Sequence, residues 1–200
     1  MNRKLFYWYH LLVRHDVLSP LAVKRFGKAG KGMLIFTPIQ LDRKRDYIRL
    51  GDNVVIRKYA RINCYPKWNA EKDNEPIITI GDNCNIGQRL SLLAGGKITI
   101  GNHVLMASDI LITSENHSIN PEDKKHYMDQ PLQCADVEIK DGCWIGEKVC
   151  IMPGVTIGKK CVIGAGSIVT KSIPDYSIAV GNPARVIKKY DFQAHKWVSV

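Results

Sequence analysis

Residues 139–174 read IKDGCW IGEKVC IMPGVT IGKKCV IGAGSI VTKSIP, six consecutive blocks that each begin with a branched aliphatic residue. Four positions after each leading residue stands a second small or branched one. An α-helix repeats every 3.6 residues and a half-buried strand every two, so a strict period of six indicates a repeat architecture. The leading residues are Ile139, Ile145, Ile151, Ile157, Ile163 and Val169, and their partners are Cys143, Val149, Val155, Cys161, Ser167 and Ile173.

Six residues make one short strand and one tight corner, and three such units close one turn of a triangular prism. We expect the leading aliphatic to point inward and its partner to fill the narrow corner. Glycine and asparagine suit the backbone conformation that a corner needs. The period therefore predicts an all-β fold, a parallel β-helix.

The same period appears earlier in three shorter blocks, separated by breaks. Residues 63–76 are polar and predict a loop, and two extra residues lie around Gly95 and Gly96. The longest break, 113–136, is charged and proline-containing, and an excursion of that length is uncommon without a function. The leading residues of these blocks are Leu50, Ile56 and Ile62, then Ile80, Ile86 and Leu92, then Ile100, Met106 and Ile112.

The length of 200 residues and an apolar fraction of 45% fit one domain with terminal additions. We expect a partly helical N-terminal segment over 1–49, the β-helical domain over 50–189, and a tail over 190–200 with a short helix or tail after Val186. No apolar run is long enough to cross a membrane, and a secretory signal is not expected. The aromatic stretch 6–9 and the apolar stretch 11–13 pack on the end of the prism or touch a membrane surface.

The net charge of +10 comes from dispersed basic residues rather than from a nucleic-acid-binding motif, so no nucleic-acid partner is expected. Part of this charge meets solvent, a polyphosphate ligand or an anionic surface. The six cysteines contain no C-x-x-C pair. Cys84, Cys143 and Cys161 fall on inward small positions, where a thiol acts as an apolar filler. Buried free thiols favour a reducing cytoplasm.

The ordered motifs WIG, PGVTIG, VIGAGSIVTK and GNPAR run from Trp144 to Arg185, and the similarity extends to Lys189. In this combination the chain resembles the hexapeptide-repeat acyltransferases, and among them the sugar and antibiotic O-acetyltransferases. The resemblance covers roughly residues 50–189. It implies a left-handed β-helix, acetyl-CoA as acyl donor, no metal, and a homotrimer with a CoA groove between neighbouring prisms.

The resemblance also implies a catalytic histidine on a loop that leaves the prism, and the matching position is His117. An alcohol is a poor nucleophile at neutral pH, and a neutral imidazole can accept its proton as the new bond forms. Glu115 or a backbone carbonyl is expected to hold the other ring nitrogen.

For the donor, the resemblance places Trp144 near the thioester and Glu147 at a position whose backbone contacts CoA in relatives. The small residues Ala165 and Gly166 leave room for the pantetheine arm. Basic side chains suit the phosphates of the cofactor through charge-assisted hydrogen bonds. The remaining expected CoA contacts are Thr170, Lys171, Arg185 and Lys188.

On the acceptor side the chain departs from galactoside-type relatives, which carry an asparagine and an aspartate where this chain has Gly87 and Gly95. The acceptor, a saccharide or a surface-polysaccharide precursor, is therefore expected to differ from a simple galactoside. The candidate acceptor contacts in the long loop are Asn116, Tyr127 and Asp129, with Arg89, Tyr65 and Trp68 as weaker ones.

Three alternatives stay open at this point. One is an acetyltransferase for antibiotics or amino sugars. Another is a γ-type carbonic anhydrase-like protein, which needs three converging histidines for zinc. His103, His117 and His126 lack the spacing for that. The last is a non-catalytic prism that acts as a scaffold.

Overall fold

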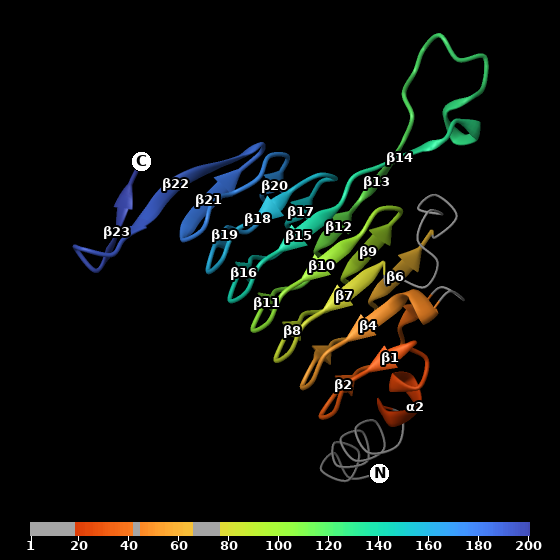
Figure 1. The fold of residues 1–200 in the computed structure, drawn as a ribbon, viewed down its shortest axis with the longest axis horizontal. Coiled ribbons are helices and arrows are strands. Elements are labelled where there is room, and N and C mark those ends of the chain that lie inside the picture. Colours follow the sequence, from red (N-terminus) through yellow and green to blue (C-terminus); the bar gives the residue numbers. More distant parts are fainter. Residues whose placement is uncertain (1–18, 42–44, 66–76) are drawn as a thin grey trace, which may run out of the picture.

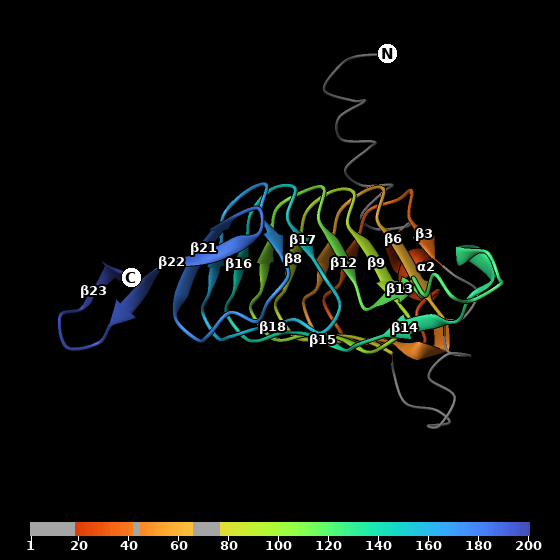
Figure 2. The same ribbon diagram turned by 90° about the horizontal axis from the view of Figure 1, so that it is seen from above.

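The computed structural model describes residues 19–41, 45–65 and 77–200, and within them the chain winds into a stack of triangular coils (Figure 1). Each coil contributes one strand to each of three parallel sheets, which form the faces of the prism and are called faces A, B and C. Figure 2 shows the coils following one another along a single axis. The prediction of an all-β parallel β-helix is confirmed.

Face A is formed by β1 (Lys28–Ala29), β4 (Ile48–Leu50), β7 (Ile78–Ile80), β10 (Ile98–Ile100), β15 (Val137–Ile139) and β18 (Thr156–Ile157). Face B begins with β2 (Leu34–Ile35), β5 (Val55–Ile56), β8 (Asn85–Ile86), β11 (Leu105–Met106), β16 (Trp144–Ile145) and β19 (Val162–Ile163). It continues through β21 (Ser177–Gly181), β22 (Ala184–Asp191) and β23 (Lys196–Ser199). Face C is formed by β3 (Gln40–Leu41), β6 (Arg61–Cys64), β9 (Ser91–Ala94), β12 (Leu111–Thr113), β17 (Cys150–Ile151) and β20 (Ile168–Val169).

The leading aliphatic residues stack in register inside the prism. Ile80 pairs with Ile100, which pairs with Ile139, which pairs with Ile157 on the next coil. Each of these four side chains is at most 1% exposed. Burying one such side chain contributes about 1.5–3 kcal/mol, so the repeated column is the main stabilising element of the fold.

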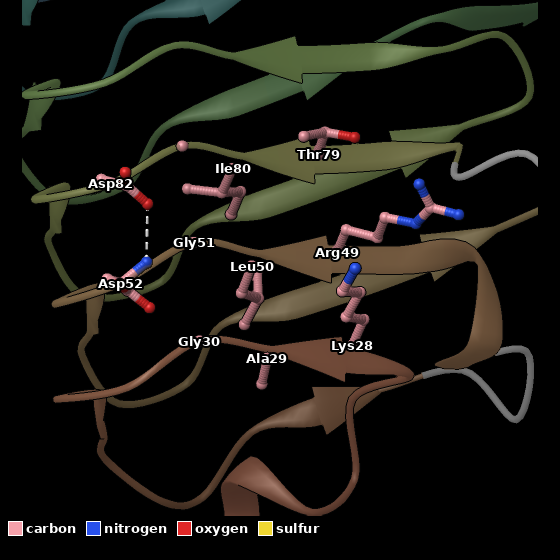
Figure 3. A pocket seen from close by; sticks show the side chains of 11 residues that line it. Lys28, Ala29, Gly30, Arg49, Leu50, Gly51, Asp52, Thr79, Ile80 and Asp82 are labelled. Atoms are coloured by element: carbon pink, nitrogen blue, oxygen red, sulfur yellow. Dashed lines mark hydrogen bonds between the residues drawn. The ribbon is translucent and has the colours of Figure 1, made fainter.

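The corner between faces A and B is held by a ladder of Asp and Asn side chains. The Oδ1 atom of Asp82 accepts the backbone N–H of Asp52 at 2.7 Å (Figure 3), and Asn102 does the same for Asp82 at 2.8 Å. Asp141 then accepts the N–H of Asn102 at 2.7 Å. Because each coil satisfies a corner donor of its neighbour, the recurrent Asp or Asn in the sequence has a structural cause.

The breaks in the period fall at one edge of the prism, where the chain passes from face C to face A. The sequence between β6 and β7, the pair Gly95 and Gly96, and residues 114–136 all connect these two faces. The last of these contains a hairpin of β13 (Glu115–His117) and β14 (Leu132–Cys134), with the 3-10 helix η4 (Tyr127–Asp129) at its tip. Figure 1 shows this hairpin projecting away from the coils.

The structure corrects the expected boundaries at both ends. The first coil begins at Lys28 rather than at Leu50, because Ala29 pairs with Leu50 and extends face A. After Val186 the chain forms antiparallel strands β22 and β23 instead of a helix or an unstructured tail. On the N-terminal side, the helix α2 (Ser19–Val23) precedes the first coil, and the 3-10 helix η2 (Arg45–Tyr47) precedes the second coil.

Some expectations concern residues that the structure does not describe: the aromatic stretch 6–9, the apolar stretch 11–13 and Trp68. Of the expected loop 63–76, Asn63 and Cys64 belong to β6 instead. In the described ranges no helix is long and apolar enough to cross a membrane. Cys84, Cys143 and Cys161 are buried, free and directed inward, as their positions in the repeat predict.

Candidate functional site

Ser114 anchors the hairpin that carries His117. Its side chain is fully buried, and its Oγ donates a hydrogen bond to the carbonyl of Gly96 at 2.8 Å. Its backbone N–H binds the carbonyl of Leu93, and its carbonyl accepts the N–H of Ala135. The hairpin therefore begins and ends on the preceding coil, and its base is fixed relative to the prism.

His117 and Glu115 lie on the same side of the hairpin, because side chains alternate along a strand. The antiparallel register pairs Glu115 with Cys134 and His117 with Leu132. Asn116, between them, points to the opposite side. His117 and Glu115 thus project to the same side, whereas Asn116 faces away from the histidine, and the expected contact of Glu115 with the imidazole stays a prediction.

A cavity of about 310 Å³ lies beside this side of the hairpin. It gathers the residue that follows β6 and residues from both hairpin strands and from the tip of the hairpin. The structure thereby places four of the residues named from the sequence, Tyr65, Glu115, His117 and Asp129, around one cavity. Its lining residues are Tyr65, Glu115, His117, Met128, Asp129, Gln130 and Leu132.

Tyr127 lies elsewhere, in a smaller cavity of about 170 Å³ at the tip, which His126 also lines. Met128, Gln130 and Leu132 were not predicted from the sequence. Leu132 pairs with His117 in the register of β13 with β14, and Met128 and Gln130 come from the tip of the same hairpin, a contact that the period of six does not encode.

Gln130 holds the tip of the hairpin in place. It is 3% exposed, and its Nε2 donates to the carbonyls of Asn120 and Lys125, both at 3.1 Å. Its Oε1 accepts the N–H of Asn120 at 3.2 Å. A buried amide with these partners fixes the loop conformation, and so it fixes the adjoining Asp129 at the wall of the cavity.

Glu115 packs over a glycine that has no space for a side chain. A Cβ on Gly95 would lie 2.7 Å from both the Cβ of Glu115 and the Sγ of Cys134. Burial raises the pKa of the Cys134 thiol, and the negative charges of Glu115 and Asp136 raise it further. Because the Cβ of any side chain at position 95 would make these close contacts, an aspartate there, as in galactoside-type relatives, is incompatible with this hairpin.

Trp144, Arg185 and Lys188, three of the expected CoA contacts, share the outer side of face B. Trp144 is 54% exposed, and its register partners lead across the sheet through Val162 and Ile178 to Lys188. Arg185 pairs with Val180 on the same side of the sheet. Since neighbouring strands are about 4.8 Å apart, Trp144 and Lys188 are separated by roughly 14 Å along the axis.

Glu147, Ala165 and Gly166 lie beside this surface, at the corner between faces B and C. The Oε2 atom of Glu147 accepts the N–H of Ser108 at 3.0 Å, so its side chain serves the corner. Gly166 has a φ of +71° and no atom within 4 Å of the place where its Cβ would be. The backbone is therefore open to a ligand at this corner.

Thr170 and Lys171 follow β20, at the edge between faces C and A, and both are exposed. The hairpin of His117 leaves the prism at this same edge, two coils earlier. Within one chain, the histidine cavity and the row on face B are therefore on different sides of the prism.

The weaker candidates take other positions. Arg89 stands at a corner between faces B and C and forms a bidentate ion pair with Asp109, at 2.5 and 2.6 Å. Gly87 begins the same corner, against the backbone of Ala107. Arg89 and Gly87 are thus remote from the histidine cavity, whereas Tyr65 lines it.

A further cavity of about 370 Å³ lies on the outside of face A, near the N-terminal end (Figure 3). Lys28, Arg49 and Thr79 project on one side of it, and the corner glycines of successive coils also line it. It contains none of the expected site residues. Among the described residues, no three His, Cys, Asp or Glu side chains converge as they would around a metal ion.

Comparison with known proteins agrees with this geometry. Residues 136–171 match the family model "Bacterial transferase hexapeptide (six repeats)", and residues 77–106 match "Hexapeptide repeat of succinyl-transferase". The putative lipopolysaccharide biosynthesis O-acetyl transferase WbbJ of Escherichia coli (strain K12) is 34% identical over 156 residues, 75% of this chain and 76% of that protein. Galactoside O-acetyltransferase of the same organism is 39% identical over 112 residues, 56% of this chain and 54% of that protein.

Solved structures show the same fold. A maltose O-acetyltransferase from Clostridium difficile 630 superposes with a TM-score of 0.56 and 33% identity, covering 84% of this chain and 72% of that one. AntD, an N-acyltransferase from Bacillus cereus in complex with dTDP and 3-hydroxybutyryl-CoA, reaches 0.72 at 22% identity, covering 90% and 92%. The latter likeness concerns the fold alone.

These findings define a left-handed parallel β-helix with acetyltransferase-type repeats. The chain belongs to the hexapeptide-repeat acetyltransferase family. It spans about half the length of several curated relatives that it matches, and 76% of WbbJ.

Proposed function

We propose that this chain is an acetyl-CoA-dependent O-acetyltransferase that acetylates a saccharide hydroxyl. The observation that carries the proposal is the cavity that His117 lines together with Glu115 and Asp129. An imidazole beside a cavity of this size, on a strand whose base is fixed by Ser114, is positioned to act on a bound hydroxyl group. The family membership supports acetyl transfer as the reaction.

In the proposed reaction, His117 accepts the proton of the acceptor hydroxyl while the oxygen attacks the thioester carbonyl of acetyl-CoA. The new carbon–oxygen bond forms and the carbon–sulfur bond breaks. The imidazolium then returns the proton to the departing thiolate, so that the products are an acetyl ester and CoA. General-base catalysis of this kind contributes about 10²–10⁴-fold to the rate.

The donor is proposed to lie along the outer side of face B. Arg185 and Lys188 project there, on the same side as Trp144, and neither forms an ion pair within the described part of the chain. Guanidinium and ammonium groups suit the phosphates of CoA. The open backbone at Gly166 leaves room for the pantetheine arm at the neighbouring corner.

We further propose a cyclic homotrimer, because one chain holds the histidine cavity and the donor row on different sides. The buried free thiols support a cytoplasmic location for it. A heterologous interface repeated around a threefold axis brings the C–A edge of one copy to face B of the next. The outer residues of the faces support this arrangement. Face A presents polar Arg49, Thr79, Thr99 and Glu138 in register, whereas face B, from β11 to β21, presents apolar Leu105, Trp144, Val162 and Ile178.

The donor assignment is tested with alanine variants of Arg185 and Lys188, assayed with acetyl-CoA and with acetyl-pantetheine, which lacks the nucleotide. Each variant should raise the KM for acetyl-CoA by the equivalent of about 1.5–3 kcal/mol, with little change in kcat and no change for acetyl-pantetheine. Lys171→Ala tests whether Lys171, at the edge between faces C and A, also contacts the phosphates of CoA.

Lys189→Ala is the matched control, because Lys189 pairs with the inward-facing Ser177 and so points to the other side of the sheet from Lys188. An equal loss with both donors, or an equal loss in the Lys189 control, would contradict the assignment.

A further inference from the structure

The polar groups beside His117 in its cavity are predominantly acidic. Glu115 comes from β13, and Asp129 comes from the end of η4, on the far arm of the hairpin. In the part of the chain that the structure describes, the lining contains no lysine or arginine. Tyr65, Met128 and Leu132 supply the apolar part of the wall.

Glu115 is held rigidly at the base of this cavity. Its backbone carbonyl accepts a hydrogen bond from Thr113 Oγ1 at 2.8 Å, and its N–H donates to the same atom at 3.3 Å. The Cβ of Glu115 packs against Gly95. The negative charge of Glu115 raises the pKa of the thiol of Cys134, its register partner. The backbone and the Cβ of Glu115 are thus fixed, which directs its carboxylate to the side of β13 that faces the cavity, where it can accept hydrogen bonds from a ligand.

Asp129 lines the same cavity from another segment, and a separate set of hydrogen bonds holds that segment. The buried amide of Gln130 fixes the tip through Asn120 and Lys125, and Asp129 stands next to it as the last residue of η4. The carboxylate is exposed and lines the cavity, and within the described residues it forms no ion pair. His117 is therefore flanked by two carboxylates from independent segments.

We propose that this cavity takes an unphosphorylated saccharide unit, with Glu115 and Asp129 as acceptors for its hydroxyl or ammonium groups. The inference rests on the proposed function and names its acceptor class. Carboxylates accept hydrogen bonds from neighbouring hydroxyls, and the apolar wall packs on the carbon-bound face of a sugar ring. The two carboxylates would instead repel a phosphate next to the reacting hydroxyl. This repulsion weakens the binding of a phosphorylated acceptor.

The test compares four acceptors: a hexose, its methyl glycoside, its 1-phosphate and its nucleoside-diphosphate form. The methyl glycoside fills the anomeric position without adding charge, so it separates size from charge. With the wild-type protein, kcat/KM for the methyl glycoside should exceed that for the 1-phosphate by about tenfold or more.

Two isosteric variants, Glu115→Gln and Asp129→Asn, remove the charges while keeping the shapes. Each should raise the KM of the neutral acceptor by about tenfold, the range expected for hydrogen bonds to a charged group. In the double variant, the ratio of kcat/KM for the methyl glycoside to kcat/KM for the 1-phosphate should move towards one. The KM for acetyl-CoA should stay unchanged. Glu122→Gln, which removes an exposed charge from the same hairpin outside the cavity, should leave the ratio as in the wild type.

The inference is overturned if the phosphate-bearing acceptors react as well as the methyl glycoside, if the double variant keeps the wild-type ratio, or if acetyl-CoA binds and none of the four is acetylated. A protein that neither binds acetyl-CoA nor releases CoA with any of them would overturn the proposed function itself. The first group of results leaves the donor assignment intact, so the two failures are distinguishable.

Discussion

Glu115 occupies the space that any side chain on Gly95 would need, since a Cβ on Gly95 would lie 2.7 Å from the Cβ of Glu115. The absence of a side chain at position 95 thus permits the hairpin to sit directly on the preceding coil. This contact links a break in the repeat to the wall of the histidine cavity, because Glu115 and His117 share one side of β13.

Gly95→Ala should displace the hairpin base, because its methyl group meets the inflexible first carbon of Glu115 and the sulfur of Cys134. We expect faster hydrogen exchange at the amides of β13 and β14, with the amides of the prism strands unchanged, and a reduced kcat/KM for the acceptor. Unchanged exchange in the hairpin would show that the contact does not position it.

Ser114→Ala should lower the free energy of unfolding by about 1–3 kcal/mol, because it leaves the Gly96 carbonyl without its 2.8 Å hydrogen bond in a buried place. Ser172 is the matched control: its Oγ accepts the N–H of Thr156 at 3.0 Å on an exposed corner, so its loss should matter less. Denaturant unfolding of both variants measures the difference. Equal losses would mean that burial of Ser114 is not what anchors the hairpin.

How much of this could be predicted from the sequence is clearest for the inward columns. Ile145, Ile151 and Cys161 are each fully buried, as the period of six predicts, because one strand and one corner leave only one inward direction for each unit. The expected start at Leu50 omits the first coil, although Ala29, Ile35 and Leu41 also stand six apart. The leading position of that coil holds a small alanine, which gives a weak signal.

At the C-terminus, the expectation of a helix or tail is wrong, because β22 is a strand. Val186 and Lys188 lie on either side of a bulge, which interrupts the alternation that indicates a strand. The histidine cavity is predictable only in part. His117 and Asp129 stand in the long excursion, but Gln130 and Leu132 reach the cavity through a hairpin register that no repeat specifies.

Cys134 should report the charge of Glu115. Because desolvation and the two nearby carboxylates raise the pKa of this thiol, its alkylation at mildly alkaline pH should be slower than that of an ordinary exposed cysteine. Glu115→Gln removes one negative charge, lowers the pKa of Cys134 and should speed the reaction. Peptide mass spectrometry measures it, with buried Cys143 and Cys161 as unreactive references. An unchanged alkylation rate in the Glu115 variant would mean that the charge of Glu115 does not affect the thiol of Cys134.

Asp109 should contribute stability that depends on pH. Hydrogen bonding to Arg89 holds the pKa of this carboxyl below its ordinary value, so the folded state binds the proton less tightly than the unfolded state. The contribution is therefore present above the ordinary pKa and disappears as the pH falls through the lowered one. Asp109→Asn should reduce Tm at neutral pH, and the gap to the wild type should close in acid. A gap that persists at the lowest pH would point to a packing effect.

Shared sites between copies predict complementation. His117→Ala lacks the proposed base, and the double variant Arg185→Ala, Lys188→Ala lacks the proposed phosphate contacts. Mixed trimers of the two should regain activity at low acetyl-CoA, because some sites then combine an intact histidine with an intact donor row. A trimer that carries all three substitutions in every chain is the control. Sedimentation as a monomer, or mixing without any gain, would contradict a shared site.

The most direct measurement is CoA release by His117→Ala at saturating acetyl-CoA and acceptor, alongside calorimetric binding of acetyl-CoA. We expect turnover reduced by about 10²–10⁴-fold with donor binding unchanged, because His117 lines the acceptor cavity and supplies none of the basic groups proposed to bind the phosphates of CoA. Turnover equal to that of the wild type would place the general base elsewhere and contradict the central claim.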